Sequence, residues 1–388
     1  MRHAESGVIS RTAIQLNNLG GGVWIIAAVA IGFVLQQGRE ILAPFALACF
    51  VWLVMEGFAR AIRKPLPSLP PLLAHAFAIL VVAGAVIGFI GVMRTAIGQF
   101  ADKSALYEHR IDTLIAQVYN QFGLSDAPTL SSLVFSDAAT RFVEPLLTSI
   151  QGVASNLVLI LIYVGFLYVS SSTFTKKLDA VFLHDDNRER ARRMGDDIRS
   201  TMEQYLWVQT ALSLITTGFT YATMLALGLD NALFWAAMIF ILNYIPTVGS
   251  ILAAVLPALF AIAQPETSWP AYMPDDPMWC AVVVFLGVSL WQFSIGNFVG
   301  PRMMGESMNL DPLAVLLSLA VWGAIWGVPG MFLSAPLTVL LMIILAQVPG
   351  ARWISVVLSA DGTPPGANRE AMAEADAANS GETDAAAA

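Results

Sequence analysis

Charged side chains are scarce in this sequence. Aspartate, glutamate, lysine and arginine make up 12% of the 388 residues, whereas 57% are hydrophobic. A soluble domain typically has about 25% charged and about 45–50% apolar residues. The composition therefore excludes an ordinary soluble protein and indicates an integral membrane protein, whose first partner is the lipid bilayer. The net charge of −8, much of it from the C-terminal tail, does not indicate a nucleic-acid-binding protein.

Cysteine and histidine are also rare, with two cysteines and four histidines in the chain. Cys49 and Cys280 each lie alone in an apolar run without CxxC spacing, so we expect packed small side chains rather than a redox site. The histidines are scattered, and no Walker A motif or catalytic constellation occurs. The sequence therefore predicts no metal site, no cofactor, no ATP hydrolysis and no enzymatic activity.

Apolar segments recur along the chain and predict an all-α, polytopic membrane protein. We expect eight helical segments, at residues 23–36, 41–58, 72–93, 152–169, 201–227, 232–263, 278–298 and 312–346. Basic residues follow the second segment (Arg60, Arg63 and Lys64) and the fourth (residues 176–199). The positive-inside rule then places these loops and both termini in the cytoplasm.

This topology divides the chain into seven parts. A cytoplasmic leader (1–22) precedes spans one to three (23–94), and an extracytoplasmic region (95–150) contains an amphipathic helix. That helix either covers the membrane or bundle surface or packs against another subunit. Span four (151–172) and a basic cytoplasmic helix (173–200) lead to a transport unit (201–347). A cytoplasmic tail (348–388), rich in Ala, Gly, Asp and Glu, should be mostly disordered.

Two of the apolar segments are interrupted by residues that disfavour helix. The interruptions are Asn243, Pro246, Gly249 and Ser250 in 232–263, and Gly323, Gly327, Pro329 and Gly330 in 312–346. Proline removes a backbone donor and glycine is flexible, so both segments should be broken helices. As one helix, 232–263 would be about 48 Å long against a hydrocarbon core of about 30 Å. It is therefore either a kinked span or a re-entrant hairpin, and two hairpins would form an inverted repeat.

Two long motifs resemble one family. Residues 242–262 (LNYIPTVGSILAAVLPALFAI) and 297–341 (NFVGPRMMGESMNLDPLAVLLSLAVWGAIWGVPGMFLSAPLTVLL) are similar to the autoinducer-2 exporter family of bacterial inner-membrane proteins. Tyr205, Leu206, Gln209 and the order of the segments are similar too. The resemblance implies cofactor-free secondary transport of autoinducer-2, of another small solute, or of sodium or lithium in exchange for protons. It also implies a homo-oligomer, a pentamer. Gly300 departs from the family, which commonly has an acidic residue before the Pro-Arg pair.

The predicted substrate-binding or gating residues surround the two interruptions. They are Asn243, Tyr244, Pro246, Thr247, Gly249, Ser250, Gln292, Asn297, Arg302, Gly327, Pro329 and Gly330. Half-helix ends offer unpaired backbone groups, and the neutral side chains suit a small polyol or sugar-like solute. The alternatives are that the polar side chains only satisfy the broken backbone, that Arg302 is an orientation charge, and that the glycines serve packing.

These residues predict export of a small organic solute by alternating access, in which the broken segments move against spans one to four. The hypothesis expects Pro246, Gly249, Pro329 and Gly330 to matter more to transport than to folding. Cation–proton antiport is the weaker alternative, because ion sites in membranes usually use buried carboxylates and the broken segments have none in their apolar cores. Glu56, beside a basic loop, is interpreted as a snorkelling surface residue. A passive channel is a third possibility, since broken helices also line pores.

Overall fold

The computed structural model describes residues 26, 29–64, 67–68, 70–124, 127–129, 131–132, 157–171, 173, 185–265, 269–273, 276–304, 309–348 and 350–363. Within these ranges every regular element is helical, apart from one isolated antiparallel bridge between Leu310 and Ser359. The described part of the chain therefore confirms the all-α prediction. The predicted leader, the first residues of span one, much of region 95–150 and the tail beyond residue 363 lie outside these ranges.

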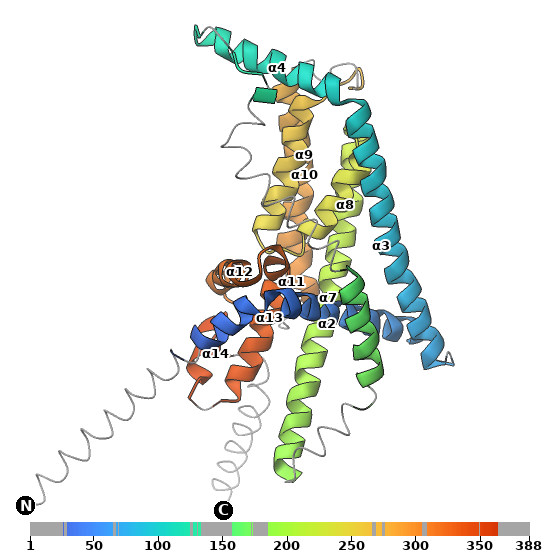
Figure 1. Cartoon of the computed structure of the whole chain (residues 1–388), viewed down its shortest axis with the longest axis vertical. Helices are drawn as coiled ribbons and strands as arrows, with labels where there is room; N and C mark the ends of the chain where they lie inside the picture. The colour runs from blue at the N-terminus through green and yellow to red at the C-terminus, as the bar shows by residue number, and fades with distance from the viewer. Residues whose placement is uncertain are drawn as a thin grey trace, which may run out of the picture.

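Helices α2 (Arg39–Arg63), α3 (Pro71–Asp102) and α4 (Ser104–Gln121) form a frame around the main bundle (Figure 1). Helix α2 runs across the bundle, and α3 rises from its end to α4. Helix α3 is apolar along its length, yet only Ala74, Ala78 and Ala96 are buried among its described side chains. Most of its surface is therefore available to lipid, as the sequence of a membrane span requires.

One continuous helix, α7 (Asp185–Leu227), contains both the basic segment and the fifth predicted span. Its 43 residues make it about 65 Å long, roughly twice the hydrocarbon core. The predicted domain boundary at residue 200 thus lies inside this continuous helix.

The broken segments follow as paired helices. Five residues separate α8 (Ala232–Leu242) from α9 (Val248–Ala263), and Gly327 alone separates α12 (Pro312–Trp326) from α13 (Val328–Ala346). Between the pairs, α10 (Pro277–Ser294), the π-helical turn η2 (Ile295–Val299) and α11 (Gly300–Met304) form one rod. The short helix α14 (Arg352–Leu358) packs against α13.

Five described helices are long and apolar enough to cross a membrane. They are Arg39–Arg63, Leu73–Asp102, Arg192–Leu227, Pro277–Met303 and Val328–Ala346. The shorter apolar helices are Leu157–Ser171, Ala232–Leu242, Val248–Ala263 and Pro312–Trp326. The protein is therefore an all-helical membrane protein with several spans.

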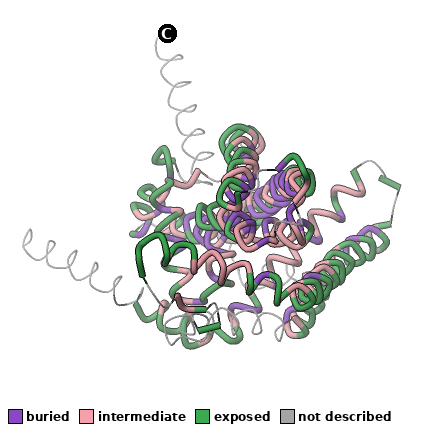
Figure 2. Tube along the Cα trace, turned by 90° about the horizontal axis from the view of Figure 1, so that it is seen from above, coloured by how far each residue is buried: buried purple, intermediate pink, exposed green. Residues whose placement is uncertain are grey.

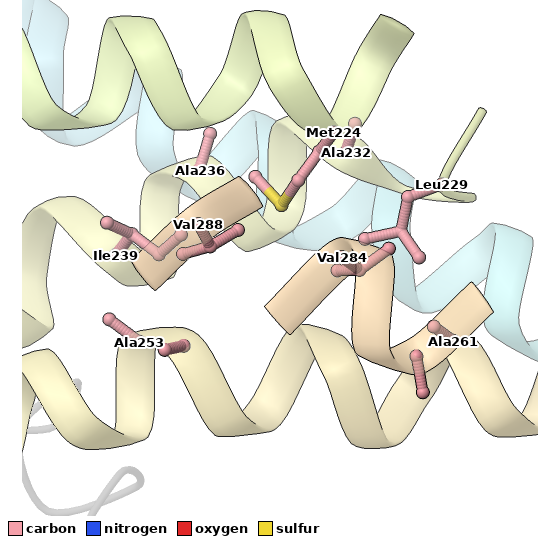
Figure 3. Close-up of a cluster of buried hydrophobic side chains, with 11 residues drawn as sticks. Met224, Leu229, Ala232, Ala236, Ile239, Ala253, Ala261, Val284 and Val288 are labelled. Carbon is pink, nitrogen blue, oxygen red and sulfur yellow. The ribbon is translucent and has the colours of Figure 1, made fainter. Parts of the chain in front are cut away.

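The main core lies where α7, α8, α9 and α10 meet. Small side chains allow these helices to approach closely, and Figure 3 shows the alanines interleaved with larger apolar side chains. The fully enclosed members include Met224, Ile239, Ala253, Val284 and Val288. Seen from above, buried residues gather inside the bundle and exposed ones lie around it (Figure 2). In a bilayer, close packing of small residues is what holds such helices together, because lipid tails are as apolar as the side chains.

Candidate functional site

The two helix breaks are built in the same way. Helix α9 starts after Thr247, a residue other than glycine with positive φ (58°), and α13 starts after Gly327, with φ of 68°. In the first turn of α9, a Cβ on Gly249 would overlap the carbonyl oxygen of Leu242. In the first turn of α13, a Cβ on Gly330 would overlap the carbonyl oxygen of Trp322. Each break therefore needs a glycine that packs on the end of the preceding half-helix.

Polar side chains from α7 and α10 converge on Asn243, the residue after α8. The Gln209 amide donates to the Asn243 carbonyl oxygen at 2.6 Å, and the Gln292 amide donates to Asn243 Oδ1 at 3.0 Å. The break leaves this carbonyl without its usual intrahelical donor, so Gln209 satisfies it. Next along the chain, the buried Tyr244 hydroxyl lies 2.8 Å from Thr210 Oγ1. We call Gln209, Thr210, Asn243, Tyr244 and Gln292 the Asn243 cluster.

An aromatic contact joins the first break to the second. The rings of Tyr244 and Phe332 are stacked, with centroids 4.8 Å apart and an interplanar angle of 25°. Phe332 lies two residues after Gly330, and Phe50 of α2 contacts both rings edge-on, at 5.8 and 5.1 Å. The fold thus brings the two breaks together, although 88 residues separate Tyr244 from Phe332 in the sequence.

Two tryptophans of α12 hold the helix that leads into the second break. Trp322 Nε1 donates to Thr338 Oγ1 at 3.1 Å, and Trp326 Nε1 donates to the Leu35 carbonyl oxygen at 3.0 Å. Asp311 caps α12 by accepting from the backbone N–H groups of Leu313 and Ala314. Pro329 is half-buried beside Gly327, where the backbone turns.

Other predicted site residues lie apart from the Asn243 cluster. Asn297 is exposed and donates to the Phe293 carbonyl oxygen of its own helix at 2.9 Å. Ser250 bonds the carbonyl oxygen of Thr247, which is itself exposed, at 2.9 Å. Arg302 is exposed on α11. These contacts are local. Among the predicted site residues, Gln292 and Asn243 share a side-chain hydrogen bond, and Tyr244 joins the cluster through Thr210.

A π-helical turn, which the sequence did not predict, precedes Arg302. Ile295–Val299 is wound with a wider turn, and the Gly300 N–H bonds the Ile295 carbonyl oxygen five residues back. Pro301 has no N–H for the Asn297 carbonyl oxygen, so a regular α-helix would leave that acceptor unpaired there. The signal was therefore the Gly300-Pro301 pair, and such π-bulges often occur at functional sites.

Gln209, Thr210, Phe50 and Phe332 were also missed. Gln209 was noted only for its similarity to the family and was not placed at the site. Thr210 is an ordinary polar residue within the fifth predicted span, and nothing local marks the two phenylalanines as neighbours of Tyr244. Glu56 requires a correction. The snorkelling interpretation is wrong, because its side chain is only 17% exposed and is paired with both His75 and Arg199, each at 2.9 Å.

An apolar groove lies between α9 and α10. Its volume is about 200 Å³, and its walls include Val255, Leu259, Ile262 and Phe285. None of the predicted site residues lines it. Among the described residues, no group of three or more His, Cys, Asp or Glu side chains could hold a metal ion.

The bundle contains helices long enough to cross a membrane, and its two broken helices meet beside neutral hydrogen-bonding side chains. This arrangement is typical of a polytopic membrane protein of the transporter class. The model of the AI-2E family transporter matches residues 23–350, and the chain belongs to this family. The spans and the family together imply a multi-pass protein of the bacterial inner membrane.

Relatives with similar sequences cover nearly the same length. The chain is 27% identical over 355 residues to the AI-2 transport protein TqsA of Escherichia coli K12, which covers 90% of this chain and 98% of that protein. It is 26% identical over 343 residues to a putative transport protein of Haemophilus influenzae, over 86% of this chain and 94% of that protein. It is 23% identical over 339 residues to the putative transport protein YhhT of Escherichia coli K12, over 84% of this chain and 89% of that protein. A membrane transporter role follows from the family.

Proposed function

We propose that this protein is a secondary-type transporter that exports a small neutral organic solute by alternating access, and that the solute binds between the two breaks. The observation that carries the proposal is the contact between Tyr244 and Phe332, which joins two breaks of the same construction. Discontinuous membrane helices are where many transporters place their substrate sites.

The chemistry of the Asn243 cluster indicates the class of solute. Its members are all neutral and include amide and hydroxyl groups. Such groups exchange one hydrogen-bond partner for a solute hydroxyl without moving charge into the membrane. The neighbouring Tyr244 and Phe332 rings offer apolar faces to a sugar-like or furanone ring. Since one relative is an AI-2 transport protein, an autoinducer-2-like signalling molecule or a related metabolite is the first candidate.

The helix lengths support a topology with re-entrant pairs. Helices α8 and α9 are about 16 and about 24 Å long, so neither alone crosses a core of about 30 Å. Helix α12 is about 22 Å and α13 about 28 Å long, so the second pair combines a half-helix with one of spanning length. We propose eight membrane segments, in which the two pairs enter from opposite faces as an inverted repeat. The N- and C-termini are then cytoplasmic.

The exposed surfaces of α3 and α4 concern a second part of the proposal, the oligomeric state. Helix α3 exposes most of its apolar surface, and α4 extends beyond the bundle (Figure 1). We propose a homo-oligomer, as the family resemblance implies, and native mass spectrometry of the solubilised full chain would count its subunits.

Flux measurements test the function. Purified protein in proteoliposomes would be assayed for uptake and efflux of autoinducer-2 and related solutes, with and without imposed sodium and proton gradients. Saturable flux of an organic solute supports the proposal. Flux that rises linearly with concentration identifies a passive channel instead.

Sodium or lithium exchange for protons is the second candidate function. The half-buried pair of Glu56 and His75 favours it, because such pairs bind protons in membrane proteins. Sodium-driven proton flux in the absence of any organic solute would establish antiport and overturn the first proposal.

A further inference from the structure

Four hydroxyl side chains in the middle of α7 differ in what they contact. Thr216 Oγ1 donates to the Leu212 carbonyl oxygen, and Thr220 Oγ1 donates to the Thr216 carbonyl oxygen, each at 2.8 Å. The hydroxyl oxygens of Ser213 and Thr217 are buried as well, but neither has a hydrogen-bond partner among the described residues. Ser213 is only 1% exposed. One helix therefore carries two paired and two unpaired buried hydroxyls.

The two unpaired hydroxyls are not explained by the helix itself. A buried hydroxyl without a partner destabilises a fold, and lipid cannot supply the missing hydrogen bond. A serine or threonine in a helix can avoid this cost by donating to the carbonyl oxygen four residues earlier. Thr216 and Thr220 do so, whereas Ser213 and Thr217 do not. Their hydroxyls thus stay available to a partner from outside α7.

Both unpaired hydroxyls lie on the face of α7 that carries the Asn243 cluster. Ser213 follows Gln209 by four residues, and Thr217 follows Thr210 by seven, so each pair shares one face of the helix. The helical rise places Ser213 about 6 Å and Thr217 about 12 Å beyond Gln209 along the axis. Helix α7 packs against α8 and α10, the helices that carry the other polar side chains at the first break. Ser213 and Thr217 therefore continue the cluster along α7.

The main core closes the other end of this row. Tyr221 and Met224 come next on the same face, and Tyr221 packs against the core to which the fully buried Met224 belongs. In the proposed topology, α7 leaves the cytoplasm at its basic end. The two hydroxyls then lie on the extracytoplasmic side of the Asn243 cluster, between it and the core.

We propose that Ser213 and Thr217 bind hydroxyl groups of the solute and extend its site from the Asn243 cluster toward the extracytoplasmic side. This inference rests on the proposed function and names the part of the solute that is recognised. A hydroxyl both donates and accepts, so the pair matches a hydroxylated neutral solute better than a cation or an anion. Such a site also selects against an analogue that lacks the hydroxyl, because its own polar groups then stay unpaired.

Transport of autoinducer-2 by the full chain in proteoliposomes tests the two residues. We expect S213A and T217V each to raise the KM about fivefold, the effect of one lost hydrogen bond. T216V and T220V are the matched controls, since their hydroxyls bond only carbonyl oxygens of α7 itself. Their KM should stay within about twofold of the wild type.

Analogues of autoinducer-2 that each lack one hydroxyl distinguish a direct contact from a structural role. The analogue without the recognised hydroxyl should bind the wild type at least about tenfold more weakly than autoinducer-2. The same analogue should lose little further affinity in S213A or T217V, because the contact is already missing there. A residue that acts only through the fold would instead give additive losses for every analogue.

Thermal unfolding of the solubilised variants tests the unpaired state without any solute. T217V should melt at or above the temperature of T220V, because only Thr220 gives up a hydrogen bond. A lower melting temperature for T217V would assign its hydroxyl to the fold and overturn the inference.

The flux results separate this inference from the proposed function. Saturable wild-type flux with equal KM values for T217V and T220V, or with additive losses for every analogue, overturns the role of the two hydroxyls and leaves the transporter standing. A wild type without saturable flux of any organic solute rejects the proposed function and this inference with it.

Discussion

At the scale of single residues, Gly249 and Gly330 show why a break occurs where it does. A methyl group at either position would overlap a backbone carbonyl oxygen, which has no flexible end that can move aside. The sequence alone predicts a greater effect on transport than on folding for these glycines and for Pro246 and Pro329. The packing now predicts that the glycines also affect folding.

We predict that G249A and G330A each lower the free energy of unfolding by about 1–3 kcal/mol or more, the cost of overpacking. The control is G88A on α3, where an added Cβ meets nothing within 4 Å. G88A should be neutral or stabilising by up to about 1 kcal/mol, because alanine favours helix. Thermal unfolding of the solubilised protein measures all three, and equal melting temperatures for G249A and G88A would contradict the account of the break.

Asn243 and Asn297 allow a matched comparison of the same substitution. Asn243 is held by Gln209 and Gln292, whereas Asn297 is exposed and donates to a carbonyl oxygen of its own helix. We predict that N243A lowers solute flux about tenfold or more, since the half-buried Gln292 amide loses its acceptor. N297A should retain near-wild-type flux in the same proteoliposome assay. Equal losses in both variants would move the site toward the π-helical turn.

At the scale of elements, the stack of Tyr244 on Phe332 couples the first broken pair to the second. A double-mutant cycle with Y244L and F332L should give a coupling energy of about 0.5–1.5 kcal/mol, the size of an aromatic pair. F332L should also slow solute flux more than F298L, since Phe298 is exposed on η2. Thermal unfolding measures the coupling, and additive single effects would show that the two breaks are independent.

A second contact between elements ties α4 to the turn before α8. Lys103 Nζ lies 2.7 Å from Asp230 Oδ2, and the Tyr107 hydroxyl donates to the same oxygen at 3.2 Å. Burial first, and then the Asp230 charge, raise the pKa of Tyr107 well above its ordinary value. The folded state therefore keeps this proton at a pH where the unfolded chain has released it.

The sign follows from linkage. Because the raised pKa makes the folded state bind the extra proton, this contribution to stability is complete below about pH 10 and is lost as pH rises further. We predict that Y107F costs about 1 kcal/mol near neutral pH, through the lost hydrogen bond. The same variant should lose less stability between about pH 9 and about pH 11 than the wild type. Parallel pH profiles of the melting temperature would exclude this role for Tyr107.

At the scale of the whole molecule, the position of the loop after α9 distinguishes the two topologies. A re-entrant α8–α9 pair returns the chain to the extracytoplasmic side, whereas a kinked span would carry it to the cytoplasm. We predict that A271C, at an exposed position in this loop, reacts with an impermeant thiol reagent added outside intact cells. A360C, exposed after α14, should react only after the membrane is opened. Replacing Cys49 and Cys280 by alanine provides the background, and protection of A271C from the outside reagent would favour the kinked span.

The sequence by itself determined the membrane class, the helical fold, the family and the position of both breaks. Each of these depends on local properties: apolar run length, the missing donor of proline, and the flexibility of glycine. That is why α8 ends at Leu242 and α12 ends at Trp326, beside the interruptions that the sequence predicts.

Only the tertiary structure decided which residues meet. Gln209 and Thr210 reach the first break because α7 packs beside α8, and Phe332 reaches Tyr244 because α13 lies against the same break. Glu56 is an ion-paired residue because α3 and α7 bring His75 and Arg199 to it. These contacts join residues that are distant in sequence, and helix packing in a membrane depends on shape rather than on a local pattern. The sequence therefore fixes where the chain bends, and the packing of the helices determines what lies at each bend.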